Sequence, residues 1–205
     1  MWPDIEKVKL SEKIPDAVLR LPRTMERFEA SRFFAGHVLT SLESRKLQTK
    51  SWLNWASIVA LPSAAVDNPL HLDFAEISLG DEWLRSQERI ELYADPLLVV
   101  LFELRNYEVH FEFRTGKIGN FRTIVESGAE QKEYDFGDAV FISAIDFISL
   151  SRLKNIQSGR SSITVEMVNW FNRQAEIWPA AYLIGVARER YARYIARFLK
   201  RNGIG

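Results

Sequence analysis

The residues best suited to chemistry gather in one short segment, residues 104–110, which reads LRNYEVH. It holds a guanidinium at Arg105, an amide at Asn106 and an imidazole at His110. A guanidinium stays charged at ordinary pH and offers oriented N–H donors to an anion. An imidazole titrates near neutral pH and exchanges protons readily. The segment therefore combines an anion-binding group with a general acid or base.

A regular helix through this segment would keep Arg105 and His110 apart. Five residues turn an α-helix through about 500°, which leaves the two positions about 140° apart, whereas Asn106 and His110 are neighbours on one face. Apolar and polar residues alternate from Val109 onward, which is typical of a strand. We therefore expect the helix to unwind near Val109 and to free His110 to approach Arg105.

An apolar helix that ends in Arg-Asn, with His four to six residues after the Arg, resembles the signature of HEPN domains. Many members of that family are metal-independent ribonucleases. The resemblance is best over residues 24–110, and only Arg105, Asn106 and His110 carry over as catalytic residues. It implies a helical bundle, a homodimer, and a cleft where the Arg and His of both protomers act on one RNA phosphodiester. It also implies that the ribonuclease activity is inhibited until it is needed, as in a toxin–antitoxin system, where an antitoxin partner binds the enzyme, or in an antiviral system.

Metal-independent RNA cleavage requires residues of these types. A neutral imidazole at His110 would remove the proton from the ribose 2′-OH. Arg105 would stabilise the charge that develops on the phosphorane, and Asn106 would orient the imidazole or contact the phosphate. The expected product is a 2′,3′-cyclic phosphate, and the expected reaction uses no metal and no other cofactor.

A structural explanation exists for the same residues. Arg105 would then pair with Glu103 or Glu108 and cap carbonyl groups at its helix end, a common role for a late-helix cation. His110 would be an exposed strand residue. This alternative corresponds to a second hypothesis, a non-catalytic helical module that binds nucleotide, RNA or protein and uses these residues to clamp a phosphate or hold a dimer.

The other two histidines, His37 and His71, are weaker candidates for catalytic residues. Arg32 and His37 have the same spacing, but Phe follows the Arg and no helix end is evident, so we interpret the pair as fortuitous. His37 and His71 are expected to be structural or solvent-facing. With 3 His and no Cys, no metal site is expected.

A basic helix face near the C-terminus is a further candidate for RNA contact. Arg193 and Arg197 belong to a run of cations over residues 188–201 in which Glu189 is the single acid. Contacts of such residues with phosphate give sequence-independent affinity. A solvated face that complements the helix dipole is the alternative. Tyr107 is another candidate, either stacked on a base or packed in the core or an interface.

Length and composition indicate one globular domain. The chain has 205 residues, of which 47% are hydrophobic and 26% charged, enough to bury a core. Its 27 basic and 27 acidic residues cancel, so no overall field attracts nucleic acid or membrane lipid. The acidic N-terminus and the lack of a long apolar run predict neither a signal peptide nor a membrane span. We expect a cytoplasmic protein.

The apolar pattern predicts a mainly α fold, a HEPN-like helical bundle with a small β-hairpin insertion after the Arg/His motif. Residues 1–23 are expected to form an N-terminal extension, and residues 24–205 a single domain with the β insertion at about 109–136. Residues 62–80 are expected to form an irregular connection that contains at most one helical turn. Strands are predicted at 109–113 and 121–125. Helices are predicted at 24–47, 52–61, 96–107, 138–153 and 163–199, and the last of these should be interrupted at Trp178-Pro179.

Overall fold

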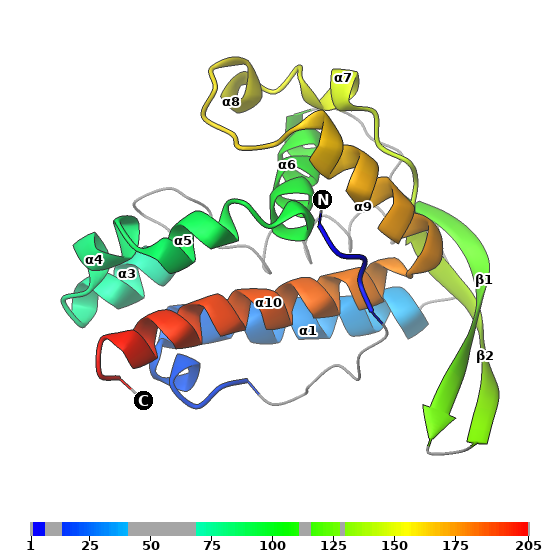
Figure 1. Ribbon diagram of the computed structural model, residues 1–205, viewed down its shortest axis with the longest axis horizontal. Coiled ribbons are helices and arrows are strands. Elements are labelled where there is room, and N and C mark those ends of the chain that lie inside the picture. The colour runs from blue at the N-terminus through cyan, green and yellow to red at the C-terminus, as the bar shows by residue number, and fades with distance from the viewer. Residues whose placement is uncertain (1, 7–13, 41–68, 111–115, 128–129, 205) are drawn as a thin grey trace.

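The computed structural model describes residues 2–6, 14–40, 69–110, 116–127 and 130–204. It describes the backbone alone for residues 34–40, 108–110, 116, 118, 123–127, 130–134 and 136. The fold is mainly α-helical with one two-stranded antiparallel hairpin (Figure 1). In chain order its elements are the 3-10 turn η1 (Val18–Arg20), helices α1 (Pro22–Thr40), α3 (Pro69–Glu76), α4 (Gly80–Leu84), α5 (Gln87–Leu92) and α6 (Pro96–His110), strands β1 (Gly116–Ser127) and β2 (Glu130–Ile142), and helices α7 (Phe147–Leu150), α8 (Lys154–Gln157), α9 (Val165–Ile177) and α10 (Ala180–Arg201).

Helix α10 organises the core. It runs beside α1, and α6 stands across this pair with α9 packed against it (Figure 1). Apolar residues at three- and four-residue steps give α10 one buried face, which includes Tyr191, Ile195 and Phe198. The centre of the Phe198 ring lies 4.9 Å from that of the Phe74 ring and 5.1 Å from that of the Trp83 ring. Helix α10 is therefore also packed against α3 and α4.

The predicted break at Trp178-Pro179 is confirmed. α9 ends at Ile177 and α10 begins at Ala180, with Pro179 in the N-cap position. Proline has no N–H for the helical ladder and its ring clashes with the preceding turn, so a continuous helix is excluded there.

The predicted unwinding at Val109 is wrong. α6 continues as a helix through His110, three residues past the predicted end at Tyr107. Most of its length is buried, and Leu97 and Val100 are 0% exposed. Packing of this length of helix outweighs the local strand preference of the alternating residues that follow Glu108.

The hairpin follows α6, as predicted, and the predicted strand at 121–125 lies within β1. The strand predicted at 109–113 is wrong at its start, because residues 109 and 110 belong to α6, and residues 111–113 lie outside the described residues. β1 and β2 pair with Asn120 opposite Asp138 and Ile118 opposite Val140. The predicted helix over 138–153 is therefore wrong at its start, because residues 138–142 belong to β2, and α7 covers only Phe147–Leu150. Cross-strand pairing and the burial of Phe141 and Ile142 decide the conformation of this stretch. In Figure 1 the hairpin stands at one end of the molecule and extends past it.

The connection predicted over 62–80 contains helix α3, which holds the start of α1. Asp73 of α3 is 1% exposed and accepts hydrogen bonds from the backbone N–H groups of Arg23 (3.3 Å) and Thr24 (2.7 Å). These are donors that the first turn of a helix leaves unpaired. α1 thus begins at Pro22, and the predicted helix over 52–61 and residues 41–47 of the first predicted helix lie outside the described residues.

The segment predicted as an N-terminal extension is packed on the domain. The Ile5 N–H donates to Oε1 of Gln174 at 2.8 Å, and Nε1 of Trp170 donates to the Pro3 carbonyl at 3.1 Å. Ile5 and Val18 both belong to the hydrophobic core. Residues 2–6 therefore form part of the surface around α9.

We predict that Gln174→Ala lowers the free energy of unfolding by about 1–3 kcal/mol, because the buried Ile5 N–H would lose its acceptor. Urea unfolding followed by circular dichroism measures the change. Arg173→Ala, at the exposed neighbouring position, is the control and should change stability by less than about 0.5 kcal/mol. Equal losses in the two variants would contradict this role for the N-terminal segment.

Candidate functional site

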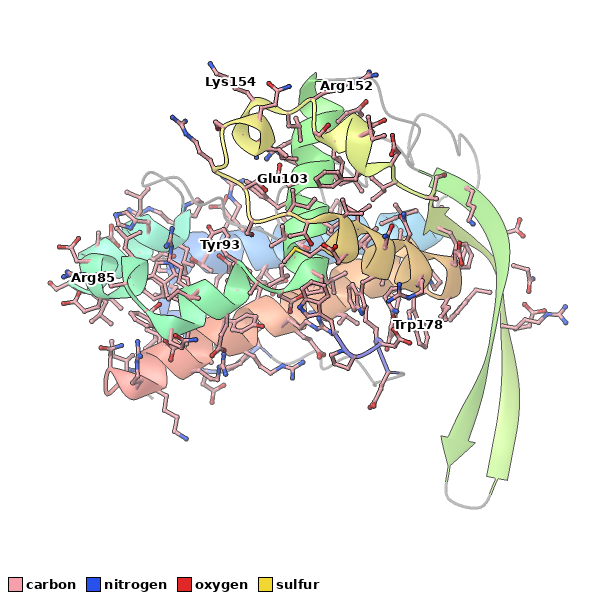
Figure 2. All side chains as sticks on the ribbon, turned by 45° about the horizontal axis from the view of Figure 1, so that its top comes forward. Arg85, Tyr93, Glu103, Arg152, Lys154 and Trp178 are labelled. Carbon is pink, nitrogen blue, oxygen red and sulfur yellow. The ribbon has the colours of Figure 1, made fainter. Side chains whose placement is uncertain are left out.

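A buried carboxylate lies at the centre of the candidate site. Glu103 of α6 is 1% exposed, and Figure 2 shows it beside the short helix α8. Nδ2 of Asn155, on α8, lies 2.7 Å from both carboxylate oxygens. Nδ2 of Asn106 donates to Oε2 at 3.3 Å. A buried charge needs such donors, so Glu103 determines how α8 and Asn106 are placed.

Asn106 connects this carboxylate to Arg105. While its Nδ2 donates to Glu103, its Oδ1 accepts a hydrogen bond of 2.8 Å from Nη1 of Arg105. The guanidinium is thus oriented by an amide that is itself held by a buried group.

Arg105 keeps an uncompensated charge within the described part of the chain. The side chain is half-buried, and its buried Nε has no hydrogen-bond partner among the described residues. No described carboxylate forms an ion pair with it, since Glu103 is bonded to the two Asn side chains. Burial lowers the pKa of Arg105 from its ordinary value. The structural explanation pairs Arg105 with Glu103 or Glu108. Arg105 forms no ion pair with Glu103, whose carboxylate accepts from Asn106 and Asn155, and the side chain of Glu108 lies outside the described residues.

His110 is the last residue of α6, and its side chain lies outside the described residues. Because the helix is continuous, backbone positions 105 and 110 lie about 140° apart around its axis. Positions 106 and 110 share one face of α6. The fold of one chain therefore brings Arg105 and Asn106 together but does not bring position 110 to the same side as Arg105.

The other candidates are placed as follows. Tyr107 is 7% exposed and belongs to the hydrophobic core, which fits its packing alternative. His71 is partly buried on α3, and Arg32 is exposed on α1, where the side chain of His37 lies outside the described residues. Within the described ranges, no three His, Asp or Glu side chains are grouped so that they could hold a metal ion.

Arg193 and Arg197 of α10 line an open groove of about 620 Å³ together with Asp95 and Pro96. This groove lies at the N-terminal end of α6. A rise of about 1.5 Å per residue places Arg105 about 14 Å further along the helix axis than Pro96. The predicted catalytic and RNA-binding arginines are therefore separated in one chain.

Sequence reasoning missed the roles of Glu103 and Asn155. A signal for the first exists, because Glu103 is the lone acid in the apolar stretch PLLVVLFEL, and such a residue must find partners when the stretch is buried. No local pattern marks Asn155, which stands 52 positions later in the chain.

Comparison with known proteins found no matching family model, no matching curated protein and no matching solved structure. Among the described helices, none combines the length and the apolar character that crossing a membrane requires. The structure thus defines a mainly helical domain with a hairpin and a polar cluster on α6.

We predict that Asn155→Asp destabilises the protein by about 2 kcal/mol or more at pH 7, because two carboxylates would face each other where an amide now donates. The facing pair raises the pKa of one carboxyl group in the folded state. The penalty should therefore shrink as the pH falls and that group becomes protonated. Urea unfolding between pH 7 and pH 4 measures this, with the exposed neighbour Lys154→Ala as control. A pH profile parallel to that of the wild type would contradict the contact.

Proposed function

We propose that this chain is a metal-independent endoribonuclease of HEPN type that acts as a homodimer. One observation carries the proposal: Arg105 is a half-buried guanidinium, oriented by Asn106, whose charge no described carboxylate neutralises. A group of this kind is suited to bind a phosphate that gains charge during reaction.

The Glu103 network supports this role because it orients Arg105 before substrate binds. Asn106 holds one guanidinium N–H group and leaves the other donors for an anion. An oriented donor does not have to reorganise when charge develops in the transition state. Asn106 is then a positioning residue and Arg105 the residue that contacts phosphate.

The continuous helix favours a site shared between two copies. Since positions 105 and 110 point to different sides of α6, a two-fold axis would bring Arg105 of one protomer toward His110 of the other. His110 would accept the 2′-OH proton, and a second His110 or water would protonate the 5′-oxygen that leaves. The products are a 2′,3′-cyclic phosphate and a 5′-hydroxyl. A toxin or antiviral effector with an antitoxin partner is the biological role that this activity would serve.

We predict that the wild-type protein cleaves labelled RNA in excess EDTA, and that Arg105→Ala and His110→Ala each slow cleavage at least about 100-fold. Arg85→Ala, an exposed arginine on the α4–α5 connection, is the matched control and should retain full activity. Gel analysis with end-group chemistry reports the rate and the cyclic phosphate. Equal behaviour of all four proteins, while folded and dimeric, would refute the proposal.

We further predict that co-expressed Arg105→Ala and His110→Ala chains regain activity. Random pairing makes about half of the dimers mixed, and each mixed dimer retains one of two Arg–His combinations, so about a quarter of the wild-type rate is expected. Each variant alone serves as the baseline. If the co-expressed chains are no more active than either variant alone, Arg105 and His110 do not act across a dimer interface.

A non-catalytic phosphate clamp is the second candidate function. It is favoured by the same divergence of positions 105 and 110, since Arg105 and Asn106 alone could hold a phosphate. RNA binding that is lost in Arg105→Ala, is unchanged in His110→Ala and occurs without cleavage would identify this function.

A further inference from the structure

The groove at the N-terminal end of α6 is separate from the Arg105 cluster and has a chemistry of its own. Its volume of about 620 Å³ lies in the range of small-molecule sites. It is bordered by the N-terminal segment, the α5–α6 connection and α10. The lining residues that matter for binding are Trp2, Asp95, Arg190, Arg193, Tyr194 and Arg197.

Arg190 is neutralised by Asp95, which is 7% exposed. Nη1 of Arg190 lies 3.1 Å and 3.2 Å from the two carboxylate oxygens, and the Tyr194 hydroxyl donates to Oδ2 at 3.4 Å. Oδ1 also accepts from the Leu97 N–H at 3.0 Å, which caps α6. Asp95 is thus fully engaged, and it fixes Arg190 in the wall of the groove.

Arg197 is likewise neutralised. It forms an ion pair with Glu91 of α5, and its guanidinium carbon lies 5.0 Å from the centre of the Tyr194 ring. Burial, together with the nearby Asp95 charge, raises the pKa of Tyr194 to about 12. The phenol is therefore neutral at physiological pH, and the Arg197 guanidinium lies over one face of its ring.

Arg193 differs from the two arginines that flank it on the same face of α10. It is exposed, and it forms no hydrogen bond or ion pair with any residue that the structure describes. Both lining acids, Glu91 and Asp95, are already used by the other two arginines. Among its described lining residues, the groove therefore has one unmatched positive charge, at Arg193.

Aromatic residues share this groove with the unmatched charge. Trp2 is partly buried against the core, and the hydrogen bonds of Pro3 and Ile5 to α9 hold its segment in place. Tyr194 stands on the α10 side. An arginine beside aromatic rings matches a phosphate beside a planar base, since rings bind bases by stacking and guanidinium groups bind phosphate.

We propose that this groove binds a nucleotide unit, with its phosphate on Arg193 and its base against Trp2 and Tyr194. The unit is either a free nucleotide or one residue of an RNA strand, and both supply the same chemistry. The site does not depend on the activity proposed for Arg105, which lies at the other end of α6.

Adenosine 5′-monophosphate, inorganic phosphate and a hexaadenylate RNA serve as probes, with affinity measured by calorimetry on the full chain. Arg193→Ala should weaken binding of the mononucleotide about tenfold or more, as expected for loss of a charge-assisted contact. Lys200→Ala is the matched control, because it removes an exposed cation two turns along α10 and outside the groove, and less than about a twofold change is expected. Trp2→Ala should weaken binding of the nucleotide but not of inorganic phosphate.

A hexanucleotide that binds at least about tenfold more tightly than the monophosphate, through Arg193, identifies an RNA strand as the source, and equal affinities identify a free nucleotide. Absence of binding by the wild type at millimolar nucleotide would overturn the proposal. Equal losses in Arg193→Ala and Lys200→Ala would also overturn it, because they indicate attraction to the basic helix in general. Since Arg193 is exposed, circular dichroism should show an unchanged fold in that variant.

Discussion

The burial of Glu103 within α6 is the constraint on which the candidate site depends. A carboxylate that is 1% exposed has to be supplied with hydrogen-bond donors, and the fold provides them from Asn155 on α8 and Asn106 on α6 itself. Because two amide side chains donate hydrogen bonds to the Glu103 carboxylate, Arg105 does not form an ion pair with Glu103. The position of α8, the orientation of Asn106 and the lack of a described carboxylate beside Arg105 are consequences of one buried group.

Carboxylates also determine which arginine remains unpaired at the opposite end of α6. Asp95 caps the helix, and together with Glu91 it neutralises two of the three arginines of α10 that line the groove. Arg193 is left with its charge unmatched among the described residues. At each end of α6 the placement of acids determines which arginine remains able to bind an anion. This is more informative than the number of basic residues, because the chain as a whole is neutral.

The predictions from sequence succeed where local chemistry dominates. The break at Trp178-Pro179 follows from proline geometry, and the amphipathic α10 follows from its apolar spacing. They fail where distant contacts decide. Residues 138–142 look helical alone but pair with β1, and the helix around Asp73 forms where it can hold the start of α1. Such contacts join residues that are far apart in the sequence, so the local spacing of apolar residues does not predict them.

For the candidate site, the sequence by itself determined the chemical groups available: Arg105, Asn106 and His110 near the end of one apolar helix, and the cations of α10. Only the tertiary structure decided that α6 stays helical through His110 and that Asn155 satisfies Glu103. It likewise decided that Arg193, unlike the arginines flanking it, forms no hydrogen bond or ion pair with a described residue. The physical reason is that a charge acquires its partners by burial and packing, which act across the whole fold, whereas residue type and spacing are local.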